Sequence, residues 1–329
     1  MMRYKIFCKK TLVCVGLFTT LKAHAISILN HLQTPSLTQE TTPWFTGPLL
    51  APSAHTIPPG HINVEPYIYF FVSQGIYNQN KQFKSLPNFY TLLEQASIQI
   101  GLNSFLDCQI TPQLFYQFSQ GERSVQPGDL PIGLNILLLN DSPGTHCPAI
   151  KLSIATTFPF GKFEQLSATK HKTDGVGSGS WMPQLSLNMS RLYQLSKDRF
   201  FSPRLSLGYE VRCSVPVEGI TVYGGDLNTK GTIYGGNVFW TDFGFECNIT
   251  KPISFAMDIY YFHRNKIKFS GTPGLSSLNH QTSEQLSLAP ALEYNWNINL
   301  GLIAGVWFTV FGKNSSQFTS AVIALNIYQ

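Results

Sequence analysis

The chain has 329 residues, of which only 12% are charged and 13% are aromatic. The charged share is about half the quarter that is usual in a soluble protein, so an ordinary globular surface is excluded as the simplest interpretation. Five of the 23 basic residues lie in residues 1–25, which leaves 18 basic residues against 18 acidic ones in the rest of the chain. The net charge of +5 therefore comes from one short segment. It gives no support for a nucleic-acid partner.

The first 25 residues have the pattern of a secretory signal peptide. Basic residues precede an apolar run at residues 11–20, and Ala23-His24-Ala25 follows it as an A-x-A cleavage site. The apolar run is about half as long as the ~20 residues that a membrane-spanning helix requires. The pattern predicts export of the chain and cleavage after Ala25.

Residues 26–62 lead into the first expected strand, and they contain residues that interrupt regular structure. Pro48, Pro52, Pro58, Pro59 and Gly60 exclude a helix or a strand just before residue 63. We expect either a periplasmic tether or a plug that folds into the space enclosed by the later strands. The tether is the interpretation that the sequence favours slightly.

Residues 201–213 alternate at every position, with apolar residues at odd numbers and polar or small residues at even numbers. This is the pattern of a strand with one oily face and one wet face. Its 13 residues are many for a soluble strand, whereas a strand tilted across a bilayer needs about 9–11 residues in the hydrocarbon. Similar patterns predict twelve strands, at residues 63–72, 92–102, 105–118, 130–139, 149–158, 182–193, 201–213, 237–249, 253–262, 284–296, 298–311 and 318–328.

The connections between these strands alternate between long and short. Bacterial outer-membrane barrels have short turns on the periplasmic side and longer loops outside, so the alternation supports the strand count. The prediction for residues 63–329 is an all-β fold, an antiparallel up-and-down transmembrane β-barrel of about 12 strands in the bacterial outer membrane. A soluble β-sandwich is the structural alternative, but it fits the strand lengths less well.

Aromatic residues near strand ends are typical of the girdles where a barrel meets the membrane interfaces. The sequence places ten such residues on the outer face: Tyr67, Tyr69, Phe158, Trp181, Phe201, Trp240, Tyr261, Trp296, Trp307 and Tyr328. Cys108, Cys213 and Cys247 share the parity of apolar neighbours, so they are expected on the same face as small hydrophobic residues.

An enzyme is not expected. The seven histidines after the predicted cleavage site all lie outside the interiors of the expected strands, and the chain has no G-x-S-x-G or H-E-x-x-H motif. No catalytic residue, metal site or cofactor is predicted.

Three stretches carry a resemblance to a known family. They read WFTGPLLAPSAHTIPPGHINVEPYIYFF at residues 44–71, KLSIATTFPFGKF at residues 151–163 and TDGVGSGSW at residues 173–181. Together they resemble the bacterial outer-membrane family labelled for the meta-pathway of phenol degradation, a transporter-like group. The resemblance implies a barrel that passes small, often aromatic compounds, and it implies no catalytic residue.

Charged residues on the inward face are the candidates for function in a barrel. Strand parity places nine there as lumen-lining residues: Asp107, Lys151, Arg204, Glu210, Arg212, Asp242, Glu246, Asp258 and Glu293. Arg204 and Arg212 are expected to face Asp242 and Glu246 across neighbouring strands. Such a ladder either shapes the field of a channel or only fills a narrow interior.

The sequence therefore predicts an outer-membrane channel or transporter for small solutes. Its expected partners are outer-membrane lipid, a small-molecule solute and the barrel-assembly machinery, and a monomer is expected. The alternative is a non-conducting barrel whose extracellular loops bind a partner or a host surface.

Overall fold

The structure is a computed structural model that describes residues 43–141, 147–272, 274 and 278–329. The predicted signal peptide, its cleavage after Ala25 and the first part of the expected tether or plug lie outside the described residues.

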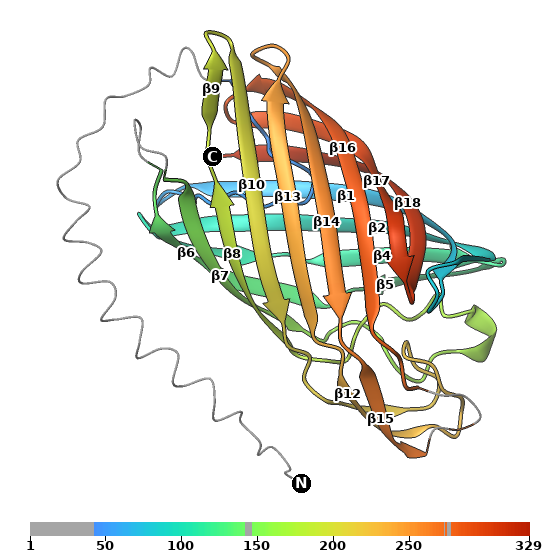
Figure 1. Ribbon diagram of the computed structural model, residues 1–329. Coiled ribbons are helices and arrows are strands. Elements are labelled where there is room, and N and C mark those ends of the chain that lie inside the picture. Colours follow the sequence, from blue (N-terminus) through green and yellow to red (C-terminus); the bar gives the residue numbers. More distant parts are fainter. Residues whose placement is uncertain (1–42, 142–146, 273, 275–277) are drawn as a thin grey trace.

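The wall of the molecule is a closed, antiparallel 12-strand β-barrel, as the sequence predicts. Strands that follow one another along the wall also pair, and β1 closes the ring by pairing with both β18 and β2 (Figure 1). The strands β3 and β4 share one place in the wall, because both pair with β2. The wall contains β1 (Ile62–Tyr77), β2 (Phe83–Asn103), β3 (Leu106–Ile110), β4 (Gln113–Ser119), β6 (Leu130–Leu139), β7 (Ala149–Phe158), β8 (Met182–Ser190), β10 (Arg199–Glu210), β13 (Val238–Asn248), β14 (Ile253–Arg264), β16 (Ser283–Asn297), β17 (Leu300–Lys313) and β18 (Ser315–Tyr328).

Shorter elements extend the barrel at its ends. At one end, which carries the long connections and which we call the loop end, β5 (Glu122–Pro127) pairs with β4. A separate three-stranded sheet forms there from β11 (Val215–Glu218), β12 (Lys230–Gly235) and β15 (Ile267–Thr272). At the opposite end, which we call the turn end, β9 (Tyr193–Ser196) pairs with β10 (Figure 1). A single 3₁₀ turn, η1 (Ala168–Lys170), lies in the connection between β7 and β8. No helix in the described part of the chain is long and apolar enough to cross a membrane.

The loops at the loop end are folded rather than extended. Val215, Val217, Ile233, Ile267 and Leu278 form a small buried cluster beneath the three-stranded sheet. We call this folded layer the cap. It explains why the long connections of the sequence contain apolar residues, because they bury a core of their own.

The two faces of the wall differ sharply in exposure. Ile68 is 45% exposed and its neighbour Tyr69 is 5% exposed, while on β18 Ile323 is 43% exposed and Ser320 is fully buried. Large apolar side chains also cover the outer face of other strands, among them Phe70, Leu134, Ile154, Leu185, Phe243 and Leu292. The barrel thus has an apolar outer surface and a largely polar inner one.

The predicted aromatic girdle is wrong for half of its members. Five of the ten residues point inward and line the interior cavity: Tyr67, Tyr69, Trp240, Trp307 and Tyr328. On β1 both faces are apolar, because Ile68 and Phe70 are exposed outside while Tyr69 is buried inside. Alternation alone does not say which of two apolar faces looks outward.

Candidate functional site

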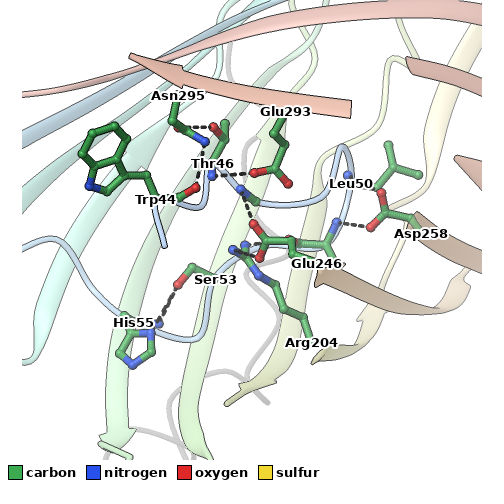
Figure 2. Close-up of polar contacts among 12 residues, drawn as sticks. Trp44, Thr46, Leu50, Ser53, His55, Arg204, Glu246, Asp258, Glu293 and Asn295 are labelled. Carbon is green, nitrogen blue, oxygen red and sulfur yellow. Dashed lines mark hydrogen bonds and ion pairs between the residues drawn. The ribbon is translucent and has the colours of Figure 1, made fainter. Parts of the chain in front are cut away.

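Residues 44–57 run through the inside of the barrel at the turn end, and we call them the inner segment. Its prolines keep it out of the sheet, so its backbone N–H groups need partners other than a neighbouring strand. The wall supplies carboxylates. The N–H of Thr46 donates to Oε2 of Glu293 at 2.9 Å, and the N–H of Gly47 donates to Oε1 of Glu246 at 2.8 Å (Figure 2).

The middle of the inner segment is held by β14 and β10. The N–H groups of Leu50 and Ala51 donate to the two carboxylate oxygens of Asp258, at 3.2 and 3.1 Å. Nη1 of Arg204 donates to the carbonyl oxygen of Ala51 at 3.2 Å, while Nη2 forms an ion pair with Oε2 of Glu246 at 2.9 Å (Figure 2). One arginine therefore connects the segment to a wall carboxylate that also binds the segment.

The far part of the inner segment contacts other strands of the ring. The N–H of Ile57 donates to Oδ2 of Asp107 on β3 at 2.9 Å, and Nζ of Lys151 on β7 donates to the carbonyl oxygen of His55 at 3.4 Å. The segment thus crosses the lumen from β16, β13 and β14 to β3 and β7.

The imidazole of His55 marks the edge of this crossing. Nε2 of His55 lies 3.1 Å from Oδ1 of Asp141, just beyond the end of β6. This hydrogen bond holds the pKa of Asp141 below its usual value. Both side chains are substantially exposed, so the pair contributes only about 0.2–1 kcal/mol to docking. The interior carboxylates therefore dominate the attachment.

Apolar packing and wall glycines complete the fit of the inner segment. Leu49 is 3% exposed and belongs to a buried cluster with Tyr69, Ile303 and Val322. At Gly244 of the wall, an added Cβ would lie 2.6 Å from Cβ of Ala51, which leaves no room for a side chain. The segment and the wall are therefore complementary in shape as well as in hydrogen bonding.

The structure places all nine of the candidate charged residues in the interior. Six have at most 1% of their surface exposed: Asp107, Lys151, Asp242, Glu246, Asp258 and Glu293. The other three line the interior cavity: Arg204, Glu210 and Arg212. Asp107, Lys151, Arg204, Glu246, Asp258 and Glu293 all contact the inner segment.

The expected charge ladder is right for one arginine and wrong for the other. Arg204 pairs with Glu246, but Arg212, two residues beyond the end of β10, pairs with Glu210, with Nε 2.9 Å from Oε1. Oδ1 of Asp242 is buried without a hydrogen-bond partner among the described residues. The register explains the difference, because Asp242 lies opposite Ser206, six residues before Arg212.

An interior cavity of about 860 Å³ runs along the inner segment, from Ile298 and Tyr328 at the turn end to Arg212 and Arg264 near the loop end. Its two sides differ in chemistry. One is aromatic, with Trp307 and Tyr260 packed edge to face at 6.2 Å and Trp240 stacked on Tyr260 at 6.3 Å. The other is lined by amide and hydroxyl side chains: Gln95, Ser97, Gln99, Gln109, Thr111 and Gln113.

A second cavity of about 570 Å³ lies between the barrel mouth and the cap, and we call it the outer pocket. Arg212 and Arg264 line both this pocket and the interior cavity. Tyr223 of the cap also lines it and donates from its hydroxyl to the carbonyl oxygen of Ser178 at 2.6 Å. Burial raises the pKa of Tyr223, although the nearby Arg212 and Arg264 oppose this effect.

Sequence reasoning missed Glu65 and Arg264 as interior charges. Glu65 accepts hydrogen bonds from Nδ2 of Asn63 at 2.9 Å and from the hydroxyl of Tyr67 at 3.2 Å. Arg264 was missed because the expected strand ended at Phe262, whereas β14 continues to Arg264. The even-numbered parity of Asp258 extends to Arg264 and was the signal that identifies it.

The described residues contain no group of three or more His, Cys, Asp or Glu arranged to hold a metal ion. No disulfide joins the four cysteines in this part of the chain, and Cys213 is exposed while Cys108 and Cys247 are half-buried. The chemistry of the interior is therefore that of fixed charges, amides and aromatic rings.

Comparison with known proteins gives structural matches only. No family model matches the chain, so the resemblance to the phenol-degradation family stays a prediction. No curated protein sequence matches it either. Among solved structures, the barrel is similar to the COG4313 outer membrane channel from Pseudomonas putida F1, with a TM-score of 0.66 and 11% identity over 84% of this chain and 98% of that chain.

Two further solved structures are more distant. The NanC porin matches with a TM-score of 0.41 and 12% identity, over 80% of this chain and 98% of that chain. The CymD monoaromatic hydrocarbon channel matches with a TM-score of 0.39 and 8% identity, over 83% of this chain and 89% of that chain. At 11% identity, the similarity to the Pseudomonas channel shows the fold alone, which is a closed barrel.

Proposed function

We propose that this protein is a bacterial outer-membrane channel for small solutes and that its inner segment closes the lumen at the turn end. The observation that carries the proposal is the cavity of about 860 Å³ inside a closed barrel, which the inner segment lines and narrows near the turn end. Small molecules of the size of a metabolite fit such a space. The fold shared with the Pseudomonas channel agrees with this role.

The outer surface supports a location in a bilayer. A closed barrel leaves no unpaired strand edge in hydrocarbon, and its outward residues carry the apolar side chains that lipid requires. Exposed Ile68, Leu134 and Ile323 are costly in water and favourable in lipid. The predicted signal peptide supplies the route of export.

The aromatic side of the cavity supports small aromatic compounds as solutes. The ring centres of Trp240 and Trp307 lie 6.3 and 6.2 Å from the ring centre of Tyr260. The faces and edges of these rings offer the stacking geometry that a substituted benzene ring prefers. The opposite side supplies amides that bind a polar substituent. This observation is independent of the sequence resemblance.

The inner segment acts as a gate in this proposal. Its C-terminal side is continuous with β1, so it is tied to the wall there, while at its other side Thr46 is held by hydrogen bonds. Opening therefore requires release of the Thr46 side. An introduced covalent bond between position 46 and the wall should therefore hold the gate closed.

A reversible disulfide tests the gate. Oγ1 of Thr46 lies 2.8 Å from Oδ1 of Asn295, so Thr46→Cys with Asn295→Cys brings two thiols together. The four natural cysteines of the barrel chain are first replaced by Ser: Cys108, Cys147, Cys213 and Cys247. In planar bilayers, we expect the oxidised protein to be silent and the reduced protein to conduct. The cysteine-free chain, which conducts under both conditions, is the control.

Two outcomes contradict the proposal in different ways. Equal currents before and after reduction, with the cross-link verified by mass spectrometry, exclude the inner segment as the gate. Silent bilayers for every variant, with correctly folded barrels, exclude the channel. The folded cap then favours the alternative function, a non-conducting barrel whose loops bind a partner.

A further inference from the structure

Two arginines stand where the two cavities meet. Arg264 is the last residue of β14, and Arg212 lies two residues after the last residue of β10, while β13 lies between these strands. Both side chains line the outer pocket and the interior cavity. A solute that moves from the cap side into the aromatic cavity therefore passes two guanidinium groups.

The carboxylate of Glu210 acts on Arg264 through its charge, but it is hydrogen-bonded to Arg212 and not to Arg264. Arg212 is paired with Glu210, but none of the ion pairs among the described residues includes Arg264. Nε of Arg264 is also buried without a hydrogen-bond partner in this part of the chain. A buried donor without a partner costs free energy, which an incoming acceptor recovers.

The acidic side chain that lines the outer pocket already has hydrogen-bond donors. Asp129 lines the pocket, but its oxygens accept hydrogen bonds from the N–H of Gly161 at 2.9 Å and from the N–H and hydroxyl of Ser178, both at 2.8 Å. It serves to join the cap loop to the barrel. Within the part of the chain that the structure describes, Arg264 is therefore the guanidinium at this junction that has no ion-pair partner.

Aromatic residues continue inward from Arg264 along the same face of β14. Phe262 and Tyr260 are the two preceding inward residues, and the guanidinium carbon of Arg264 lies 5.6 Å from the centre of the Phe262 ring. Alternate residues of a strand are about 6.8 Å apart. A ligand whose carboxylate binds Arg264 thus places an attached ring beside Phe262.

We propose that Arg264, assisted by Arg212, binds the carboxylate of a small aromatic acid at the channel mouth. The ring points inward and packs against Phe262 and Tyr260. The role of this site in transport rests on the proposed channel function, but binding itself does not require an open channel.

Calorimetric titration of the detergent-solubilised protein with benzoate and with benzamide tests the site. The two probes have nearly the same shape, and only benzoate is charged. We expect benzoate to bind at least about tenfold more tightly, because charge-assisted bidentate hydrogen bonds are the stronger ones. Arg264→Gln should remove this preference and leave benzamide binding unchanged, whereas Arg264→Lys should restore part of it.

Arg123→Gln is the matched control, because Arg123 lies on the exposed face of β5 at the same end of the barrel. It removes the same charge and should leave both affinities as they are. Phe262→Ala should weaken both probes by a similar factor.

Equal affinities for benzoate and benzamide in the unsubstituted protein overturn the inference, whether or not Arg264→Gln folds. An unchanged preference in a folded Arg264→Gln protein overturns it as well. Benzoate binding in a protein that carries no current leaves this site intact and contradicts only the channel.

Discussion

At the scale of single residues, Arg204 connects the inner segment to the wall. Its guanidinium binds both the carbonyl oxygen of Ala51 and the carboxylate of Glu246, and Glu246 is fully buried. An ion pair of this kind is worth little compared with an apolar replacement of both partners, but removing one partner leaves an unpaired buried charge. The structure therefore makes the loss of Arg204 alone more harmful than the loss of both charges.

Arg204→Met should lower the free energy of unfolding by about 3 kcal/mol, because Glu246 is left buried and unpaired. Urea titration followed by the shift of the folded band on gels measures the change. The double variant Arg204→Met with Glu246→Gln should recover much of the loss. A double variant that is less stable than the single one contradicts this account, and Arg123→Met serves as the exposed control.

At the scale of elements, the inner segment is as much a part of the fold as any strand. It is not paired in the sheet, yet four of its backbone N–H groups between Thr46 and Ala51 donate to wall carboxylates. The wall in turn has glycines where the segment passes. Gly244 lies beside Ala51 and Pro48, whereas Gly301 lies beside Thr46. A side chain at either glycine occupies the space of the segment.

Gly244→Ala should loosen the inner segment without changing any charge. The new Cβ would lie 2.6 Å from Cβ of Ala51 and 3.0 Å from Cγ of Pro48, which the native arrangement does not tolerate. Overpacking of this kind costs about 1–3 kcal/mol, so the ratio of docked to undocked segment should fall about tenfold. The fraction of time that single molecules conduct in planar bilayers measures this ratio.

Gly133→Ala is the control for that experiment. Gly133 lies on the inner face of β6, but its Cβ would meet Cβ of Ala155 at 3.1 Å rather than the inner segment. Its conduction should match that of the unsubstituted protein. Equal open fractions for Gly244→Ala and Gly133→Ala would show that the segment does not respond to crowding.

At the scale of the whole molecule, the apolar outer face determines where the protein is stable. Ile323 lies near the middle of β18 and points outward. Ile323→Arg should destabilise the barrel in lipid vesicles by about 2–4 kcal/mol, the cost of a cation near the bilayer midplane. Leu227→Arg, at a cap residue that is 79% exposed, should change stability little. Equal effects in the two variants would contradict the proposed membrane position.

The sequence predicts the barrel well because its evidence is local. Alternation along each strand and alternation of long and short connections require no knowledge of distant contacts, and all twelve expected strands are found in the wall. The strands of residues 130–139 and 149–158 have the expected ends, whereas the strand expected at residues 182–193 ends at Ser190 in β8, and β9 begins only at Tyr193. Local patterns miss the extensions beyond the wall, and they also miss the break between β3 and β4 within the strand expected at residues 105–118.

The contacts of the site depend on information that alternation does not contain. Parity placed Glu246, Asp258 and Glu293 on the inner face, but their partners are backbone groups of a proline-rich stretch about 200 or more residues away. On β1 both faces are apolar, so the aromatic side of the cavity was assigned to lipid. Charge pairing was predicted only between neighbours, which gave Arg204 its partner and gave Arg212 a wrong one.

The continuity of the inner segment with β1 has a consequence for the order of assembly. β1 closes the ring by pairing with β18, the last strand of the chain, and the hydrogen bond from Thr46 to Glu293 joins residues 247 positions apart. The inner segment therefore finds its partners only after nearly all of the chain is in place. Contacts between residues so far apart in the sequence form slowly. A wall that closes in the wrong register leaves the interior carboxylates without donors. We therefore expect the finished barrel to be most stable when β1 and β18 pair in the correct register, because only then does the inner segment find its hydrogen-bond partners.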